Sequence, residues 1–336
     1  MPGSSCRPRD RRSHWRSHGG MIKHRSKSIC DHLFPAHRRR RGIRKDDWAK
    51  GRPIPLARLR SLVFIFQPEL ILIMPELPDV EIFERYLDAT ALDQKIARVS
   101  VKNRTVLRHI SPQAIARNLE GRKLRSSRRH GKFLFGELDK NGSVIFHFGM
   151  TGFLKYFKDK AEEPEHTRVR LEFSTGSFLA YVCSRMFGEV DHTRDVNEYI
   201  KKRGLGPDAL AVTREQFKDR LAGKKSSIKS ALMDQKLLAG IGNLYSDEIL
   251  FQARVHPQDR VDRLSERVLE RICKMMKSVL KGTIRYRADP HRVPQSWLLP
   301  HREKGANCPR CGKGLRRLTI MQRSTYICPK CQRRGG

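Results

Sequence analysis

Two pairs of cysteines near the C-terminus constrain the fold of this chain more than any other feature. Cys308 and Cys311 flank Pro-Arg, and after sixteen intervening residues Cys328 and Cys331 flank Pro-Lys. Two such pairs deliver four thiolates to one tetrahedral zinc ion and leave no open position for water. We therefore expect one structural Zn²⁺ that holds a two-stranded hairpin within residues 297–336, in preference to a redox pair or disulfides.

The chain is strongly basic, and most of this charge lies outside its N-terminal end. Its 336 residues include 70 Lys and Arg against 35 Asp and Glu, a formal net charge of +35. Residues 1–73 carry +13 of it, so residues 74–336 carry the other +22. A balance of this kind indicates a polyanionic partner, and the length allows two domains of ordinary size.

Residues 1–73 differ in composition and periodicity from the remainder of the chain. Arg38–Arg41 is an uninterrupted basic run, and neither a helical nor a strand period persists. We interpret this stretch as a disordered basic leader before a mis-assigned start, although a transit peptide has a similar composition. The apolar run 61–73 is short and interrupted by polar residues, so we expect no membrane partner.

The other four cysteines give no sign of a disulfide framework. Cys6, Cys30, Cys183 and Cys273 are scattered along the chain, which favours free thiols in a reducing compartment. Together with the lack of a credible secretion signal, this pattern predicts a cytoplasmic protein.

The sequence Met74-Pro75-Glu76-Leu77-Pro78 looks like the N-terminus of a protein, although it lies inside this chain. If the mature chain starts at Pro75, the proline nitrogen is a free secondary amine and a potential nucleophile, whereas a peptide bond to Met74 makes it an unreactive amide. The alternative is a stiff linker that enters a helix, because proline is favoured at helix starts. Helical spacing of apolar residues from Asp79 to Leu87 predicts that helix.

Short alternating segments separated by turn residues follow this helix. They predict antiparallel strands of a sandwich or barrel, within a domain over residues 74–203. The segments are 96–101, 122–127, 132–138, 143–148, 153–157, 168–173 and 178–182.

Residues 204–296 have a helical pattern after a Gly-Leu-Gly-Pro linker. Thr213 and Gln216 form a capping-box pattern, and helices are expected at 228–238, 244–252 and 265–280. Gly240 and Gly242 precede the second of these helices. A helix N-terminus exposes backbone N–H groups that can bind a phosphate, so we expect a phosphate there.

Five motifs in a fixed order resemble the formamidopyrimidine-DNA glycosylase family of bifunctional base-excision enzymes. They are Pro75–Glu81, His147–Gly152, Leu205–Pro207, Leu232–Lys236 with Gly240–Tyr245, and Gln322–Thr325. The resemblance covers residues 75–332. It implies an α+β fold with an N-terminal antiparallel β-sandwich, a helix-two-turns-helix DNA-binding domain at 204–296 and a C-terminal zinc-ribbon hairpin.

The resemblance also implies an activity and a partner. Members excise oxidised bases, above all formamidopyrimidines and oxidised purines, from double-stranded DNA, and they cleave abasic strands by β- and δ-elimination. By this resemblance the Pro75 amine attacks C1′ and forms a Schiff base, and Glu76 transfers protons at the sugar. We accordingly expect a monomeric DNA-repair enzyme, glycosylase and lyase, associated with a bacterial nucleoid.

Further residues take roles from the resemblance alone. Lys132 and Arg323 match catalytic and DNA-contacting positions near the lesion, and Asn243 matches a phosphate ligand. His147 lies in a motif expected to contact DNA. Three other residues match the side chains that fill the space left by a flipped nucleotide, namely Met150, Arg185 and Phe187.

Two departures leave alternatives open. Cys183-Ser184-Arg185-Met186-Phe187-Gly188 stands where the family often has Asp-Pro-Arg-Arg-Phe-Gly, and the connection from Gly282 to Cys308 is shorter than the usual lesion-capping loop. Recognition of 8-oxoguanine therefore does not follow from the resemblance. An endonuclease VIII-like enzyme for oxidised pyrimidines is one alternative, although Leu77 favours the formamidopyrimidine branch. A silent DNA-binding protein, with its proline nitrogen acylated by a retained leader, is the other.

Overall fold

The computed structural model of this chain describes residues 74–335, and the predicted leader at 1–73 lies outside them. The first described helix is α2 (Leu77–Ala91). Glu76 and Asp79 form a capping box at its start, and Pro78 suits the first turn because its missing N–H would have no helical partner there. The helix extends the predicted Asp79–Leu87 segment by one turn at its C-terminal end.

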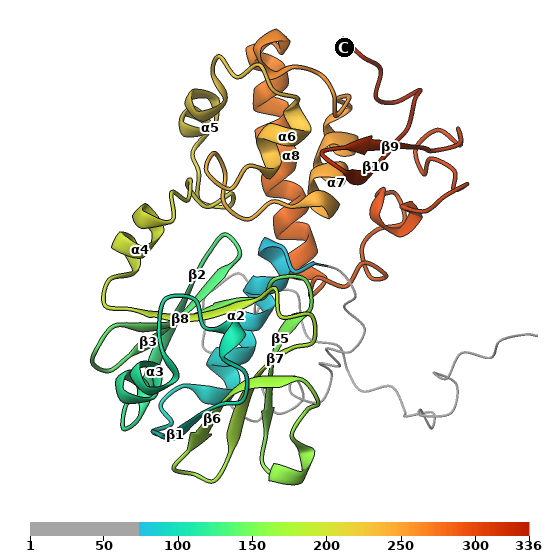
Figure 1. Cartoon of the computed structure of the whole chain (residues 1–336). Helices are drawn as coiled ribbons and strands as arrows, with labels where there is room; N and C mark the ends of the chain where they lie inside the picture. Colours follow the sequence, from blue (N-terminus) through green and yellow to red (C-terminus); the bar gives the residue numbers. More distant parts are fainter. Residues whose placement is uncertain (1–73, 336) are drawn as a thin grey trace, which may run out of the picture. The chain divides into compact units, whose positions relative to one another are not determined.

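Two four-stranded antiparallel sheets follow α2 and share one apolar core, as a sandwich requires (Figure 1). All seven predicted strands are present. In order across the sheets, the strands of the first are β1 (Ile96–Val101), β6 (Thr167–Phe173), β7 (Phe178–Cys183) and β5 (Gly152–Phe157), and those of the second are β2 (Leu124–His130), β3 (Phe133–Leu138), β4 (Ser143–His147) and β8 (Glu189–Thr193).

Several elements of this part escaped the sequence pattern. The edge strand β8 pairs with β4 and alternates too weakly, with four polar residues in five, to be predicted. The helices α3 (Pro112–Leu119) and α4 (Val196–Lys202) are short, and each begins at a side-chain cap, Ser111 and Asp195 respectively. Two single 3₁₀ turns complete the part, at Arg104–Val106 and Lys160–Glu162.

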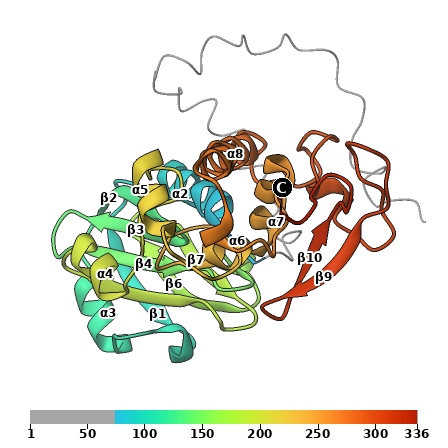
Figure 2. The ribbon, with the colours of Figure 1, turned by 90° about the horizontal axis from the view of Figure 1, so that it is seen from above.

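The helical part has its own core, made by α5 (Arg214–Leu221), α6 (Ile228–Met233), α7 (Asn243–Ala253) and α8 (Glu266–Arg285) (Figure 2). The predicted capping box of Thr213 and Gln216 is confirmed. The predicted helix at 228–238 is wrong in its second half, because α6 ends at Met233. Asp234 takes an extended conformation and accepts the N–H of Lys236 on its own carboxylate, which favours a turn over a further helical turn.

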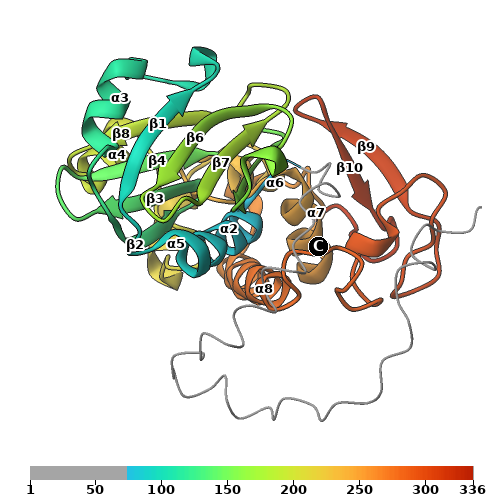
Figure 3. The same cartoon turned by 90° about the horizontal axis from the view of Figure 1, so that it is seen from below.

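The helix α2 connects the two parts by contacts on both sides. It packs against β2, β3 and β5 of the sandwich and against α8 of the helical part, as Figure 3 shows. Leu77, at the start of α2, is fully buried in the helical core. The N-terminal end of the described chain is therefore held where sandwich and helices meet. The predicted domain boundaries at 203/204 and 296/297 stay predictions.

The chain ends in a two-stranded antiparallel hairpin of β9 (Arg316–Ile320) and β10 (Arg323–Ile327), after 3₁₀ turns at Val261–Arg263 and Leu299–His301. Met321 and Gln322 form its turn, both with positive φ, as a two-residue hairpin loop requires. Phe251 of α7 and Leu298 pack against Cys308 and Cys328 below the strands. None of the helices within 74–335 combines the length and the apolar character that crossing a bilayer requires.

Candidate active site

The segment before α2 is fixed to the helical part through Glu76, whose side chain is buried. One carboxylate oxygen of Glu76 accepts the N–H of Gly242 at 2.5 Å, and the other accepts the N–H of Leu244 at 2.8 Å. The N–H of Tyr245 approaches the first oxygen at 3.4 Å. These three backbone N–H groups at the start of α7 are therefore not free for the phosphate that the sequence suggested, because a carboxylate of the chain itself already occupies them.

The two glycines before α7 are needed for this close approach. A Cβ atom on Gly242 would lie 2.4 Å from the Glu76 carboxylate, and one on Gly240 would lie 2.5 Å from the Leu77 side chain. Gly240 also has a φ of +118°, which side-chain-bearing residues rarely adopt. Its carbonyl accepts the N–H of Leu77 at 3.0 Å. The glycine pattern thus accommodates the segment that carries Pro75.

A second carboxyl group lies beside Glu76. Asp79 accepts the backbone N–H of Glu76 at 2.9 Å and is buried. Burial, with a smaller contribution from the nearby Glu76 carboxylate, raises the pKa of Asp79 to about 7. Burial also raises the pKa of Glu76, although Lys132 and the three backbone donors oppose the change. Two buried carboxyl groups, both with a raised pKa, therefore lie together at the start of α2.

The turn between β2 and β3 carries Lys132 and is held against residues 206–208, in the segment between the sandwich and the helical part. Asp208 accepts the N–H of Gly131 at 2.8 Å and forms an ion pair with Arg129. The His130 ring lies 2.9 Å from the carbonyl oxygen of Gly206. These contacts, which join residues more than seventy positions apart, fix the backbone directly before Lys132.

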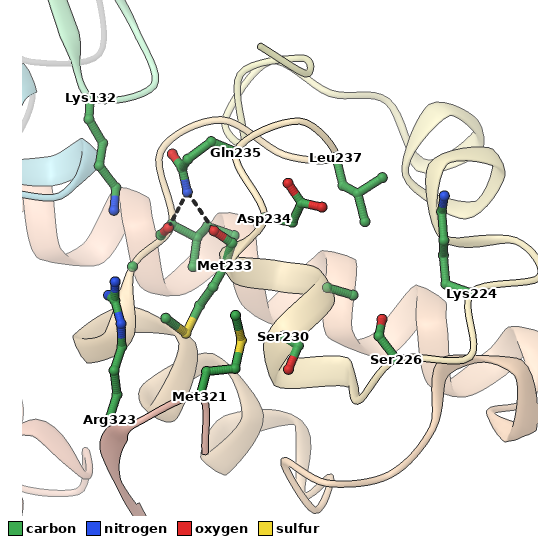
Figure 4. A pocket seen from close by; sticks show the side chains of 13 residues that line it. Lys132, Lys224, Ser226, Ser230, Met233, Asp234, Gln235, Leu237, Met321 and Arg323 are labelled. Carbon is green, nitrogen blue, oxygen red and sulfur yellow. Dashed lines mark hydrogen bonds between the residues drawn. The ribbon is translucent and has the colours of Figure 1, made fainter. Parts of the chain in front are cut away.

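Lys132 and Arg323 line one cavity of about 460 Å³, together with Gly242, Met233 and Met321. In Figure 4 the two cationic side chains point toward one another, Lys132 from the turn between β2 and β3 and Arg323 from β10. Burial lowers the pKa of Lys132, with Glu76 opposing the change and Arg323 reinforcing it. The structure thus brings together two of the predicted site residues, and they form an electropositive site next to Glu76.

Asn243 lies at the same junction, but its side chain already has partners within the chain. Its amide nitrogen donates to the carbonyl of Ser324 at 3.0 Å, and its oxygen accepts from Lys229 at 2.8 Å. Lys229 is fully buried and also bonds to Asp247 at 2.5 Å and to Thr325 at 2.7 Å. The second hydrogen of the Asn243 amide is still available to a ligand.

The predicted wedge residues lie on two neighbouring loops and do not line this cavity. Thr151, next to Met150, accepts the backbone N–H of Arg185 at 3.2 Å. The Arg185 guanidinium lies 5.7 Å from the centre of the Phe187 ring, and Phe187 is 60% exposed. An aromatic ring so exposed is available to a partner. Met150 is only half-buried.

His147 is held between strands rather than presented as a cation. Its ring lies 4.7 Å from the Phe133 ring, and its Nδ1 is buried without a hydrogen-bond partner among residues 74–335. Burial lowers the pKa of His147 to about 4, so the ring is neutral at pH 7. A contact from His147 to DNA stays a prediction, and it would have to use a neutral imidazole.

The four cysteines of the hairpin form one compact cluster. The sulfur atoms of Cys308 and Cys331 are 3.9 Å apart, those of Cys311 and Cys328 are 3.5 Å apart, and all four lie within 4.8 Å of one another. Sulfurs at about 2.3 Å from a central zinc in tetrahedral geometry lie about 3.8 Å apart. The donor set fits one zinc ion.

Sequence reasoning missed the buried ionic network around Asp247. One Asp247 oxygen pairs with Lys229, and the other accepts from Arg302 at 2.9 Å and from the N–H of Tyr326 at 3.2 Å. The only sequence signal was a lysine directly after Ile228 at the start of an apolar helix. Asp79 was also missed as a site residue. Asp79 lies beside Glu76, but an aspartate in the first turn of a helix is usually explained as a capping residue, so its position alone did not suggest a role in a site.

Comparison with known proteins assigns all three parts of the chain. Residues 74–190 match the formamidopyrimidine-DNA glycosylase N-terminal domain, residues 204–294 match the H2TH domain of the same enzymes, and residues 307–334 match a zinc finger found in FPG and IleRS. The zinc-finger match and the four-cysteine cluster agree, and the hairpin holds one structural zinc ion.

Curated relatives and solved structures agree with these matches. The formamidopyrimidine-DNA glycosylase of Streptococcus pyogenes serotype M6 is 34% identical over 275 residues, 78% of this chain and 99% of the relative. That of Mycoplasma mobile is 30% identical over 272 residues, 77% of this chain and 99% of the relative. The Lactococcus lactis enzyme in complex with DNA containing an abasic site covers 77% of this chain with a TM-score of 0.70 and 26% identity. This chain belongs to the formamidopyrimidine-DNA glycosylase family.

Proposed function

We propose that this chain excises formamidopyrimidines and other oxidised purines from double-stranded DNA and cleaves the abasic strand by β- and δ-elimination. Curated relatives bear the name formamidopyrimidine-DNA glycosylase, and the Lactococcus lactis structures contain DNA with a formamidopyrimidine or an abasic site. The observation that carries the proposal is the anchoring of the Pro75–Leu77 segment beside Lys132 and Arg323. We also propose the bacterial nucleoid as the place of action, because these relatives are bacterial.

The Pro75 nitrogen is the nucleophile in this proposal. In a chain that begins at Pro75, its lone pair attacks C1′ and the damaged base leaves with the bonding electrons. The resulting imine links Pro75 to the deoxyribose and acidifies the neighbouring C2′ hydrogens, so the 3′ and then the 5′ phosphate depart. Because Glu76 follows directly and is rigidly bonded to α7, it is positioned to carry protons at the sugar.

The cations of the cavity hold the strand for this reaction. Neither Lys132 nor Arg323 forms a direct ion pair within residues 74–335, so a DNA phosphate between them would neutralise two charges that now repel each other. Asn243 can add one N–H donor to the same phosphate region. On the sandwich loops, Phe187 and Arg185 are exposed and able to enter the duplex beside the extruded nucleotide.

Trapping with borohydride tests the proposal directly. A chain that begins at Pro75 is incubated with a duplex containing one formamidopyrimidine lesion or one abasic site, and borohydride reduces any imine to a stable amine. We expect a covalent adduct on the N-terminal peptide and strand ends that both carry phosphate. Absence of the adduct and of cleavage on both duplexes would overturn the proposed function.

Glu76→Gln provides the matched variant. It keeps the size of the side chain but removes the proton-transfer group, so we expect strand cleavage to slow by about 10²-fold or more. The unfolding midpoint is measured in parallel, because the amide also presents N–H groups to the backbone donors of α7. Cleavage at the unmodified rate in a folded Glu76→Gln chain would remove Glu76 from the chemistry.

A further inference from the structure

The helix α8 presents a row of basic side chains on the face that it does not bury. Its apolar residues belong to the helical core, and the helix packs against α2, α5 and α7. The exposed positions recur every three or four residues, so they follow one another in a line along the helix. We call this line the α8 stripe, and its members are Arg267, Arg271, Lys274, Ser278, Lys281 and Arg285.

The α8 stripe contains no acidic side chain. The two glutamates of α8, Glu266 and Glu270, lie outside it and already pair with basic side chains of α5. Four of the five stripe cations make no hydrogen bond or ion pair within residues 74–335, and the fifth, Arg271, donates to the carbonyl of Ala253 at 2.8 Å. At a rise of 1.5 Å per residue, these positive charges extend over about 27 Å without a counter-charge.

Stabilisation of the helix does not explain the α8 stripe. Like charges three or four positions apart on a helix repel each other, and the stripe contains several such pairs. Arg267 lies in the first turn, where the positive end of the helix dipole disfavours a cation, and only Arg285 lies in the last turn, where the dipole favours one. The stripe therefore lowers the stability of α8, and a polyanionic partner would offset that cost.

Duplex DNA is the polyanion that fits a row of this kind. Each strand carries one phosphate for every 3.4 Å of the duplex axis, so a row of about 27 Å extends along about eight base pairs. Insertion into a membrane is excluded, because the protein core already covers the apolar face of α8.

The α8 stripe is separate from the cavity that holds Lys132 and Arg323. None of its residues lines that cavity. Figures 2 and 3 show α8 along one edge of the helical part, whereas α6, which contributes Ser230 and Met233 to the cavity, lies away from that edge. A duplex on the stripe would therefore be a different segment from a duplex at the cavity.

We propose that the α8 stripe binds a second segment of duplex DNA while the cavity side of the molecule holds the first. The chain then passes from one segment to the other without release into solution, because the second contact forms before the first is lost. This inference rests on the proposed function only in placing the first duplex at Lys132 and Arg323. It adds a means of moving between DNA segments to the proposed repair activity.

The test measures how fast the 336-residue chain leaves a labelled duplex that contains a stable abasic analogue, while unlabelled intact duplex is added in increasing excess. Simple release has a rate constant that does not depend on the competitor, whereas transfer through a second contact becomes faster as the competitor concentration rises. We expect a several-fold rise, which becomes smaller as the salt concentration increases. Residues 1–73 are present in every variant, so their charge is common to all measurements.

Two variants that lose the same charge are compared with the unmodified chain. The stripe variant keeps Arg271, because this side chain bonds to the backbone of Ala253, and carries Arg267→Gln, Lys274→Gln, Lys281→Gln and Arg285→Gln. The control variant changes exposed lysines of the sandwich and carries Lys95→Gln, Lys140→Gln, Lys158→Gln and Lys160→Gln. We expect the competitor to have no effect on the release of the stripe variant and its full effect on the control variant. Urea unfolding shows that both variants are folded.

The inference is wrong if the competitor does not accelerate release of the unmodified chain, or if it accelerates release of the stripe variant equally. An equal loss in both variants would assign the effect to total charge and would also overturn it. Polyglutamate at the same charge concentration is the second competitor. If polyglutamate accelerates release and duplex DNA does not, the stripe binds an acidic protein instead.

Failure of the proposed function would be seen separately. In that case the unmodified chain would show no preference for the duplex with the abasic analogue over an intact duplex of the same sequence. The effect of the competitor is then measured with the intact duplex as the labelled partner, and the same comparison of variants still decides whether the α8 stripe binds a second segment.

Discussion

Two buried carboxylates, Glu76 and Asp247, join segments of the chain that are far apart in sequence, and they do so with different partners. Glu76 is bonded to backbone N–H groups at the start of α7, and the nearest cation, Lys132, makes no ion pair with it. Asp247 pairs directly with Lys229 and Arg302 and also accepts a backbone N–H from β10. The second junction satisfies its charges internally, whereas the first leaves cations free.

This difference separates a structural junction from a functional one. A buried ion pair with all its partners contributes to holding two segments in register, and it offers nothing to a ligand. A site with unpaired cations beside a protonatable carboxyl group is poised for an anion and for proton transfer. The Asp247 junction therefore positions the hairpin, and the Glu76 junction holds the segment that carries Pro75. The predictions that follow test this contrast.

Zinc removal should have the largest effect, because it dismantles the support of the Asp247 junction. Binding of zinc to finger peptides contributes about 10–16 kcal/mol of apparent free energy near pH 7, and folding depends on it. We expect chelation to unfold the hairpin of β9 and β10, to expose the amides of residues 316–327 to hydrogen exchange and to weaken DNA binding. The sandwich should keep its exchange protection. Full DNA affinity in zinc-free protein would contradict this dependence, and restoring zinc is the control.

Asp247→Asn tests whether the second junction is structural. Asparagine preserves the shape but leaves Lys229 and Arg302 without a counter-charge, in a site where Lys229 and Asp247 are fully buried. Removing one partner of a buried pair costs about 3–5 kcal/mol. We expect urea unfolding to show a loss of this size. Asp262→Asn, which breaks an exposed ion pair with Arg260, is the matched control and should change stability little. Equal losses in the two variants would erase the contrast.

The first junction should reveal itself by its dependence on pH. The pKa of Asp79 is raised from 3.8 to about 7, so the folded chain binds a proton that the unfolded chain has already released in this interval. The free energy of unfolding therefore falls as pH rises from about 4 to about 7, by at most about 4 kcal/mol from this group. Asp79→Asn should flatten the slope in urea unfolding measured at several pH values. An unchanged slope would mean that Asp79 is ionised throughout.

The contrast also explains how much of the molecule could be predicted from sequence. Strands, the hairpin and the zinc ligands follow from local patterns, because alternation, turn residues and cysteine spacing act over short distances. The resemblance to the family then named Pro75, Lys132 and Arg323, which local patterns alone would not single out. These site assignments stay predictions until they are measured.

The junctions themselves could not be predicted, because their partners are far apart along the chain. Glu76 bonds to Gly242 across 166 residues, and Lys229 bonds to Thr325 across 96. The glycines before α7 suggested a phosphate site since a helix N-terminus attracts anions in general. The anion found there belongs to the protein, so the rule was correct in its physics and wrong in the identity of the ligand.

Arg323→Ala should have the smallest effect, and it tests whether the unpaired cation near Glu76 is a phosphate ligand. Arg323 is exposed and has no ion pair within residues 74–335, so its loss should leave the folded structure and its stability almost unchanged. A DNA phosphate that binds it releases condensed counterions, and the slope of log affinity against log salt should become shallower by about 0.9. Arg316→Ala, exposed at the far end of the same hairpin, is the control. An unchanged slope for Arg323→Ala would mean that no DNA phosphate binds this side chain. Arg323 would then lie beside the cavity without using its charge, and Lys132 would be left as the cation that faces the DNA there.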